Sequence, residues 1–105
     1  MSHDDVLAML EEAGVPYAYD HFAEGESPEP PFICFRYPRA DNFGADNTVY
    51  ARSNELDIEV YTDYKDPVLK ESIEEILTDA ELYYKKSEVW IESEKLYEVL
   101  YTVTV

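Results

Sequence analysis

The sequence predicts an α+β domain, a mainly antiparallel sheet with two helices packed on one face. Residues 56–61 alternate apolar and polar side chains, a period of two that is typical of a strand with one buried face. Residues 67–80 follow almost directly and repeat apolar side chains at helical spacing. Ten tyrosines also favour sheet, because tyrosine fits a half-exposed pleated surface. The predicted order of elements is α-β-β-β-β-α-β-β.

The first predicted helix begins close to residue 2. Ser2 or Asp4 can cap it, and acidic side chains in its first turn suit the positive end of the helix dipole. Its apolar stripe consists of Val6, Leu7, Leu10 and Ala13. Gly14 is expected to end this helix, and Pro16 prevents the helix from resuming.

Three strands are predicted before the central one. Residues 17–22 form a short strand, and the Glu-, Ser- and Pro-rich stretch 23–31 is a loop, because prolines do not fit a sheet interior. Residues 32–37 form the second strand, which the following proline closes. Residues 48–52 form the third. The turn-forming run 41–47 lies between them, so the second and third strands are expected to pair as a hairpin with a long tip.

The central strand and helix occupy residues 54–80. Asp66 is suited to cap the helix, and Pro67 fits its first position, where a missing N–H costs nothing. The apolar face of the helix comprises Leu69, Ile73, Ile76, Leu77 and Ala80. Residues 82–91 and 96–105 then form the last two strands, and the apolar content of residues 96–105 predicts pairing up to the end of the chain.

Composition indicates one domain that spans residues 1–105. The single cysteine, Cys34, excludes an internal disulfide, and its neighbours Phe32, Ile33 and Phe35 indicate a small buried hydrophobe rather than a nucleophile. No apolar run approaches the ~20 residues of a membrane span. The first residues do not resemble a signal peptide, so we expect synthesis in a reducing cytoplasm.

The charge is strongly negative, with 24 Asp and Glu against 8 Lys and Arg, a net charge of −16. Such a surface repels phosphates, so sequence-reading contact with nucleic acid is not expected. A solvated, self-repelling surface explains the excess, and a DNA mimic that blocks a DNA-binding enzyme is the sharper alternative. The acids are spread along amphipathic elements rather than gathered in one run, which favours the first interpretation.

The sequence contains no recognisable catalytic, cofactor or metal site, and the protein is predicted not to be an enzyme. The histidines, His3 and His21, have no nucleophile at a useful spacing, and the three glycines form no phosphate-binding loop. Carboxylate pairs such as Glu74/Glu75 and Glu92/Glu94 are read as solvated. The Asp and Asn residues of the 41–47 run do not follow the calcium-loop order and are the residues that any turn needs.

Several segments nevertheless resemble small tail-completion proteins from the head–tail joining region of siphophages and of prophages in Gram-positive bacteria. The resemblance covers nearly the whole chain and keeps the order of the segments, although no single motif is chemically diagnostic. It is carried by Pro31-Phe-Ile-Cys-Phe-Arg-Tyr37, Asp41-Asn-Phe-Gly-Ala-Asp-Asn-Thr-Val-Tyr50, Leu56-Asp-Ile-Glu-Val-Tyr-Thr-Asp-Tyr-Lys-Asp-Pro67, Tyr84-Lys-Lys-Ser-Glu88 and Ile91-Glu-Ser-Glu-Lys-Leu-Tyr-Glu-Val99.

The resemblance implies a tail terminator or head–tail joining protein, made in the bacterial host cytoplasm and located at the head-proximal end of the virion tail. Its implied partners are further copies of itself in a ring, typically a hexamer, the major tail tube protein and a head-completion or connector protein. DNA would only pass through as cargo. The alternatives are a neighbouring head–tail connector layer, or an acidic inhibitor or DNA mimic encoded by a mobile element.

Two physical expectations follow from the charge. Six copies of a chain of net charge −16 would carry −96, so the isolated protein is expected to remain monomeric or weakly associated in low salt, where the Debye length grows to ~30 Å. Salt, divalent cations or the tail tube would then promote assembly. Loop 41–47 is expected to face the ring lumen or a neighbour, with Asp41 and Asp46 keeping DNA from adhering.

Overall fold

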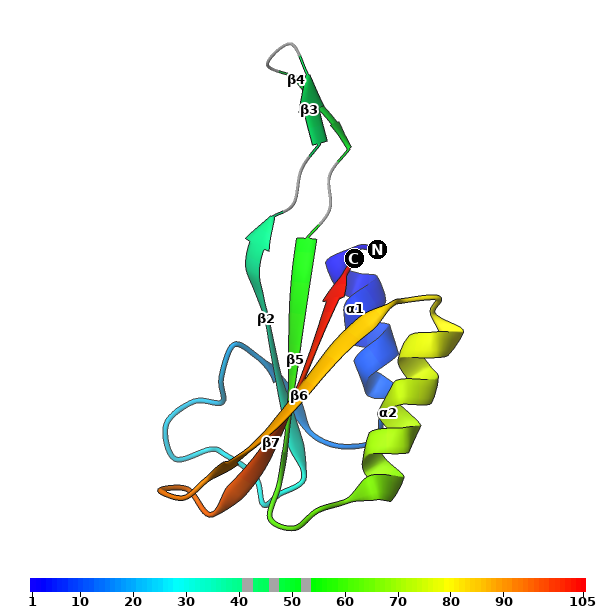
Figure 1. Cartoon of the computed structure of the whole chain (residues 1–105). Coiled ribbons are helices and arrows are strands. Elements are labelled where there is room, and N and C mark those ends of the chain that lie inside the picture. Colours follow the sequence, from blue (N-terminus) through cyan, green and yellow to red (C-terminus); the bar gives the residue numbers. More distant parts are fainter. Residues whose placement is uncertain (41–42, 46–47, 52–53) are drawn as a thin grey trace.

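The computed structural model describes residues 1–40, 43–45, 48–51 and 54–105, and in these it contains two helices and seven strands (Figure 1). The elements are α1 (His3–Glu11), β1 (Tyr17–Tyr19), β2 (Phe32–Ala40), β3 (Phe43–Ala45), β4 (Thr48–Ala51), β5 (Asn54–Thr62), α2 (Pro67–Asp79), β6 (Tyr84–Ile91) and β7 (Leu96–Thr104). The α+β class is confirmed.

The main sheet has five strands in the order β1-β2-β5-β7-β6. Only β1 and β2 run parallel, and the β2/β5, β5/β7 and β6/β7 pairs are antiparallel. The central strand of the prediction, β5, is also central in the sheet. Strand β7 is paired to its end, because Asn54 and Val105 exchange backbone hydrogen bonds of 3.0 and 2.8 Å. This confirms the predicted pairing of the final residues.

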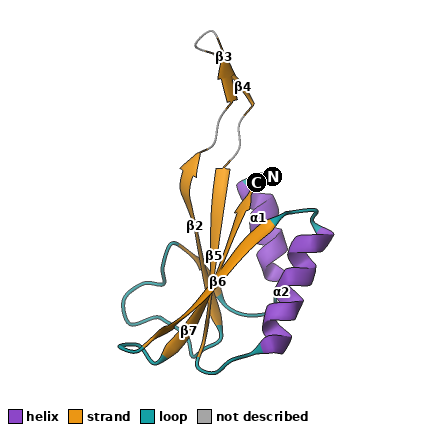
Figure 2. Ribbon diagram, in the orientation of Figure 1, coloured by secondary structure: helices purple, strands orange, loops and turns teal. Residues whose placement is uncertain are grey.

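The predicted hairpin of residues 32–37 with residues 48–52 is wrong. Strand β2 pairs with β5 instead, while β4 pairs with β3 in a separate two-stranded sheet (Figure 2). Pairing with β5 sets Ile33 beside Val60 and Phe35 beside Ile58, so four apolar side chains share one face. The segment 48–51 offers no comparable alternation.

Strand β2 also continues through Pro38 instead of ending there. The register with β5 shifts between Arg36 and Arg39, so the proline lies at an irregularity where its missing N–H interrupts no regular ladder bond. Residues 41, 42, 46 and 47 of the predicted loop, including Asp41 and Asp46, lie outside the described residues.

Both helices begin as predicted. The Ser2 side chain accepts a hydrogen bond from the Asp5 N–H, and the Asp5 carboxylate accepts one from the Ser2 N–H, which forms a capping box at α1. Asp66 caps α2 by accepting from the Leu69 N–H at 3.0 Å. Gly14 follows α1 at φ +73°, the left-handed conformation that glycine adopts without strain.

Two strands are shorter than predicted, and the backbone at the shortened end of each explains why. β1 ends at Tyr19 because Asp20 adopts φ +65°, which turns the chain out of the extended path. β6 begins at Tyr84 rather than at residue 82. The N–H of Leu82 bonds to the carbonyl of Leu77 at 2.9 Å, so this residue closes the turn that follows α2 and is not yet in the strand.

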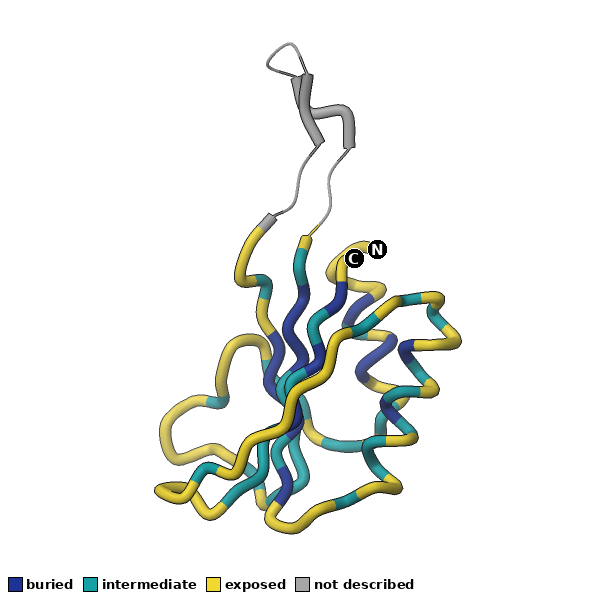
Figure 3. Tube along the Cα trace, in the orientation of Figure 1, coloured by how far each residue is buried: buried dark blue, intermediate teal, exposed yellow. Residues whose placement is uncertain are grey.

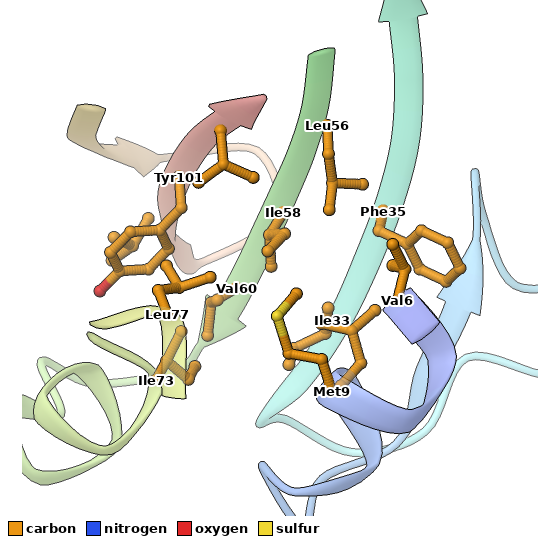
Figure 4. Close-up of a cluster of buried hydrophobic side chains, with 13 residues drawn as sticks. Val6, Met9, Ile33, Phe35, Leu56, Ile58, Val60, Ile73, Leu77 and Tyr101 are labelled. Carbon is orange, nitrogen blue, oxygen red and sulfur yellow. The ribbon is translucent and has the colours of Figure 1, made fainter. Parts of the chain in front are cut away.

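The hydrophobic core lies between the helices and one face of the sheet (Figure 4). Val6 and Met9 of α1 and Ile73 and Leu77 of α2 point toward this face. The sheet contributes Ile33, Phe35, Leu56, Ile58, Val60, Val99, Tyr101 and Val103. The predicted apolar face of α2 is therefore confirmed, with Leu69, Ile76 and Ala80 half-buried at the margin of the core.

Candidate functional site

One face of the sheet carries no helix, and the polar side chains of the alternating strands point to this face. Three carboxylate side chains of β5 lie on this face, and each is less than a quarter exposed. They are Glu55, Asp57 and Glu59. Because β5 is the middle strand of the sheet, these acids have neighbouring side chains on both β2 and β7.

Asp57 is the most buried of these carboxylates, with the whole residue 7% exposed. Thr102 on β7 donates its hydroxyl hydrogen to the Asp57 carboxylate at 3.1 Å. Arg36 on β2 bridges Asp57 and Glu59, with Nε 3.8 and 3.4 Å from their carboxylate oxygens. The acids are thus held by neighbours on both adjoining strands, which fixes their positions in the sheet.

Glu59 also accepts a hydrogen bond of 2.7 Å from the Tyr61 hydroxyl. Burial, followed by this hydrogen bond and the nearby charges of Glu59 and Glu98, raises the pKa of Tyr61 well above its ordinary value. The phenol therefore stays protonated and can donate its hydrogen to Glu59.

A hollow of about 300 Å³ lies where this face meets the loop after β1 and the β6–β7 turn. It brings together Asp20, His21 and Cys34, residues that the sequence did not connect. Burial, together with the charges of Glu59 and Asp20, raises the pKa of the Cys34 thiol. A nucleophilic cysteine needs the opposite shift, so the electrostatics of this hollow do not favour a thiol active site.

The two histidines lie in separate settings. His3 shares a hydrogen bond of 2.8 Å with the Tyr37 hydroxyl and packs beside the rings of Tyr19 and Phe35. His21 is exposed and contacts Asp20 at 3.0 Å. Cys34 is 7% exposed, which confirms that it is a buried residue.

On the helix side, one carboxylate joins three elements. Glu74 of α2 accepts hydrogen bonds from the hydroxyls of Tyr101 and Tyr84 at 2.8 and 3.0 Å, and from the Lys86 ammonium at 3.1 Å. Partial burial works against ionisation of Glu74, but these three hydrogen bonds outweigh it and hold its pKa below the ordinary value. The prediction that Glu74 is simply solvated is wrong, whereas its neighbour Glu75 is exposed.

Strand β6 forms one edge of the sheet. Among the described strands it pairs only with β7, so one side of its backbone over Tyr84–Ile91 has no strand partner there. Figure 3 shows β6 exposed along most of its length, in contrast to the buried stretches of β2, β5 and β7. An open edge with exposed side chains is a surface that another chain can pair with.

The opposite side of the molecule has a different charge character. Residues 1–35, which include α1, β1 and the loop before β2, contain no Lys or Arg. Their acidic residues, all exposed, are Asp4, Asp5, Glu11, Glu12, Asp20, Glu24, Glu26 and Glu29. These eight acids carry half of the net charge of −16 within one third of the chain. A count of charges by segment, rather than for the whole chain, would have found this signal in the sequence.

Within the described part of the chain, no group of three or more His, Cys, Asp or Glu side chains is arranged to hold a metal ion. Over the same residues, neither helix has the length and apolar character that crossing a bilayer requires. The chain matches no protein-family model and no curated protein.

Proposed function

We propose that this protein is a structural component of a phage or prophage tail that caps the tail tube as a ring in the head–tail joining region and provides a surface for head attachment. The observation that carries the proposal is the resemblance of five segments to tail-completion proteins, together with where those segments lie. Four of them form β2, β5, β6 and the β6–β7 turn with the first half of β7. In the sheet these strands are consecutive, in the order β2-β5-β7-β6.

The surface chemistry supports a role in assembly. The buried carboxylates on β5 are neutralised in part by Arg36 and by hydroxyl donors, which makes them a fixed polar surface rather than reactive groups. The buried thiol has a raised pKa, which is unfavourable for attack on a substrate. Such a molecule acts through the shape and charge of its outside, on copies of itself, on the tail tube protein and on a head-completion protein. DNA would pass the ring without being bound, because the net charge repels phosphates.

The decisive experiment is electron microscopy of phage tails assembled without this protein. Tubes of excessive length would show that the protein stops tube growth. Tails of normal length that fail to join heads would assign it to the adjacent connector layer instead. Normal tails on infectious particles would contradict both roles.

A second candidate function is an acidic inhibitor or DNA mimic encoded by a mobile element. The observation that favours it is the stretch 1–35, which holds eight exposed acids and no Lys or Arg. A mimic would compete with duplex DNA for a DNA-binding enzyme, and the competition would weaken steeply with salt. Negative-stain images of the purified protein with divalent cations separate the two functions, because rings favour the tail protein.

A further inference from the structure

We propose that copies of this chain bind one another head to tail, with the β6 edge of one copy against the α1–β1 side of the next. The proposal rests on the proposed ring and names the surfaces that would form it. The two surfaces lie at opposite ends of the sheet order β1-β2-β5-β7-β6. A contact between two different surfaces is heterologous, so repeating it closes a ring or continues as a filament.

The lysines lie at one end of the sheet. Three of the eight basic residues are Arg36, Arg39 and Arg52, which leaves five lysines. They are Lys65, Lys70, Lys85, Lys86 and Lys95, which all lie between the end of β5 and the start of β7. Over residues 63–95 ten Asp and Glu outnumber these lysines, but strand β6 itself carries Lys85 and Lys86 against Glu88, a net charge of +1. The edge strand is therefore the part of this end that can attract the acidic stretch 1–35 of a neighbouring copy.

Most of these lysines are engaged within the chain. Lys65 and Lys70 approach Glu88 of β6 at 3.7 and 3.6 Å, and Lys86 contacts Glu74. Lys85 has no acid within 4 Å among the residues that the structure describes, and its side chain is exposed on the edge strand. It is the lysine best placed to meet an acid from another copy.

The large exposed apolar side chains also lie at the two proposed contact surfaces. In the described residues the large exposed ones are Tyr64, Val68, Tyr83, Val89 and Trp90 at the β6 end, and Met1 and Tyr19 at the α1–β1 end. The set includes no side chain from β2, β5 or β7, the three middle strands. Apolar groups at both proposed contact surfaces are typical of protein interfaces.

Salt separates the local attraction from the overall repulsion. Two copies of net charge −16 repel over the width of the domain, whereas opposite charges at the contact are only a few ångströms apart. At ~0.15 M salt the Debye length is about 8 Å, which screens the long-range term much more than the close pairs. Association is therefore expected at moderate ionic strength.

A charge-swap experiment tests the contact. In the lysine-reversed variant, Lys65→Glu and Lys85→Glu replace two lysines of the β6 end by acids. In the acid-reversed variant, Asp4→Lys and Glu24→Lys place two lysines in the stretch 1–35, whose charge falls from −8 to −4. Each variant alone presents like charges at the contact and is expected to lose self-association by about tenfold or more, measured by sedimentation velocity at ~0.15 M NaCl. An equimolar mixture regains it, because each altered end then meets an opposite charge on the other variant.

The matched control is Glu71→Lys with Glu75→Lys, which changes the net charge by the same amount as the acid-reversed variant but at two exposed positions of α2. It is expected to associate at least as well as the native chain. Circular dichroism confirms that each variant is folded before it is scored. The proposal is overturned if the folded variants do not associate when mixed, if the acid-reversed variant alone associates like the native chain, or if the native chain stays monomeric under these conditions.

Failure of this contact and failure of the tail function give different results. Overlong tails without the protein, combined with no rescue in the mixture, would keep the tail role and reject these contact surfaces. Rescue in the mixture, combined with normal tails, would keep the contact and reject the role in the tail.

Discussion

At the scale of single residues, Glu74 has the largest structural role of any acid on the helix side. Tyr101 is fully buried and its hydroxyl donates to Glu74, so removal of the carboxylate would leave a phenol hydrogen without an acceptor inside the protein. The same carboxylate holds Tyr84 and Lys86 of β6. One side chain therefore fixes α2 against both strands at that end of the sheet.

We predict that Glu74→Ala lowers the free energy of unfolding by about 2–3 kcal/mol, because a buried hydroxyl loses its charged acceptor. Glu75→Ala is the matched control, since Glu75 is the next residue of the same helix and is exposed. It is expected to change stability by less than ~0.5 kcal/mol. Urea unfolding of the two variants measures both effects, and equal losses would contradict the role assigned to Glu74.

The same carboxylate predicts a pH dependence. The pKa of Glu74 is lower in the folded chain than its ordinary value, so the folded state binds this proton less readily than the unfolded state. Its stabilisation is present above the unfolded value of about 4.3 and is lost as the pH falls through the folded value. The stability difference between the native chain and Glu74→Gln is therefore expected to shrink between about pH 5 and pH 3. A constant difference over this range would show that ionisation of Glu74 is not what stabilises the fold.

Cys34 gives a further prediction at this scale. The thiol is buried and its pKa is raised, so both access and ionisation disfavour its reaction. A thiol reagent near pH 8 is expected to modify the native chain at least tenfold more slowly than the chain in denaturant. Equal rates would show that the hollow beside Cys34 opens freely.

At the scale of elements, helix α2 depends on a cap that the sequence reveals directly. Asp66 accepts from the Leu69 N–H, and Pro67 occupies the first helical position. Asp66→Ala is expected to destabilise the protein by about 1 kcal/mol, because the N–H loses its acceptor. Asp63→Ala removes a nearby exposed carboxylate that is not the N-cap of α2, and it serves as the control. Thermal unfolding compares the two, and an equal effect would mean that charge, not capping, matters at this helix start.

Local sequence patterns predicted the helices and strands better than they predicted which strands pair with each other. The caps at Ser2 and Asp66 and the stop at Gly14 depend on neighbours within a few residues, so the sequence revealed them. The pairing of β2 with β5 depends on residues far apart in the chain, and the proximity of residues 48–52 suggested the wrong partner. Alternation identifies a strand but does not say which strand lies beside it.

The candidate surface was predictable only in part. The acidic excess was evident from composition, and its concentration in residues 1–35 could have been counted. The buried state of Asp57 and the triple hydrogen bonding of Glu74 could not have been predicted, because their partners Thr102 and Tyr101 lie 45 and 27 residues away. In a chain with 24 acids, sequence alone does not separate those that the fold engages from those that water surrounds.

At the scale of the whole molecule, charge and packing act in opposite directions. The core between the helices and the sheet is built from buried side chains of a single chain. The outer surface carries a net charge of −16, with all lysines toward one end and no Lys or Arg in the first third of the chain. Folding and assembly should therefore respond differently to salt, since core burial is much less sensitive to ionic strength than repulsion between copies.

This difference leads to a prediction for the isolated protein. At ~0.01 M salt with a chelator present, the Debye length of ~30 Å leaves the repulsion between copies almost unscreened, so the chain is expected to be folded and monomeric. Raising the salt to ~0.15 M or adding Mg²⁺ screens or bridges the carboxylates, and larger species should appear while the circular dichroism spectrum stays unchanged. Sedimentation velocity and circular dichroism on the same samples separate assembly from folding. A stable ring at the lower salt concentration with chelator would mean that short-range contacts exceed the repulsion of about −96 charges in a hexamer, and that net charge does not control assembly.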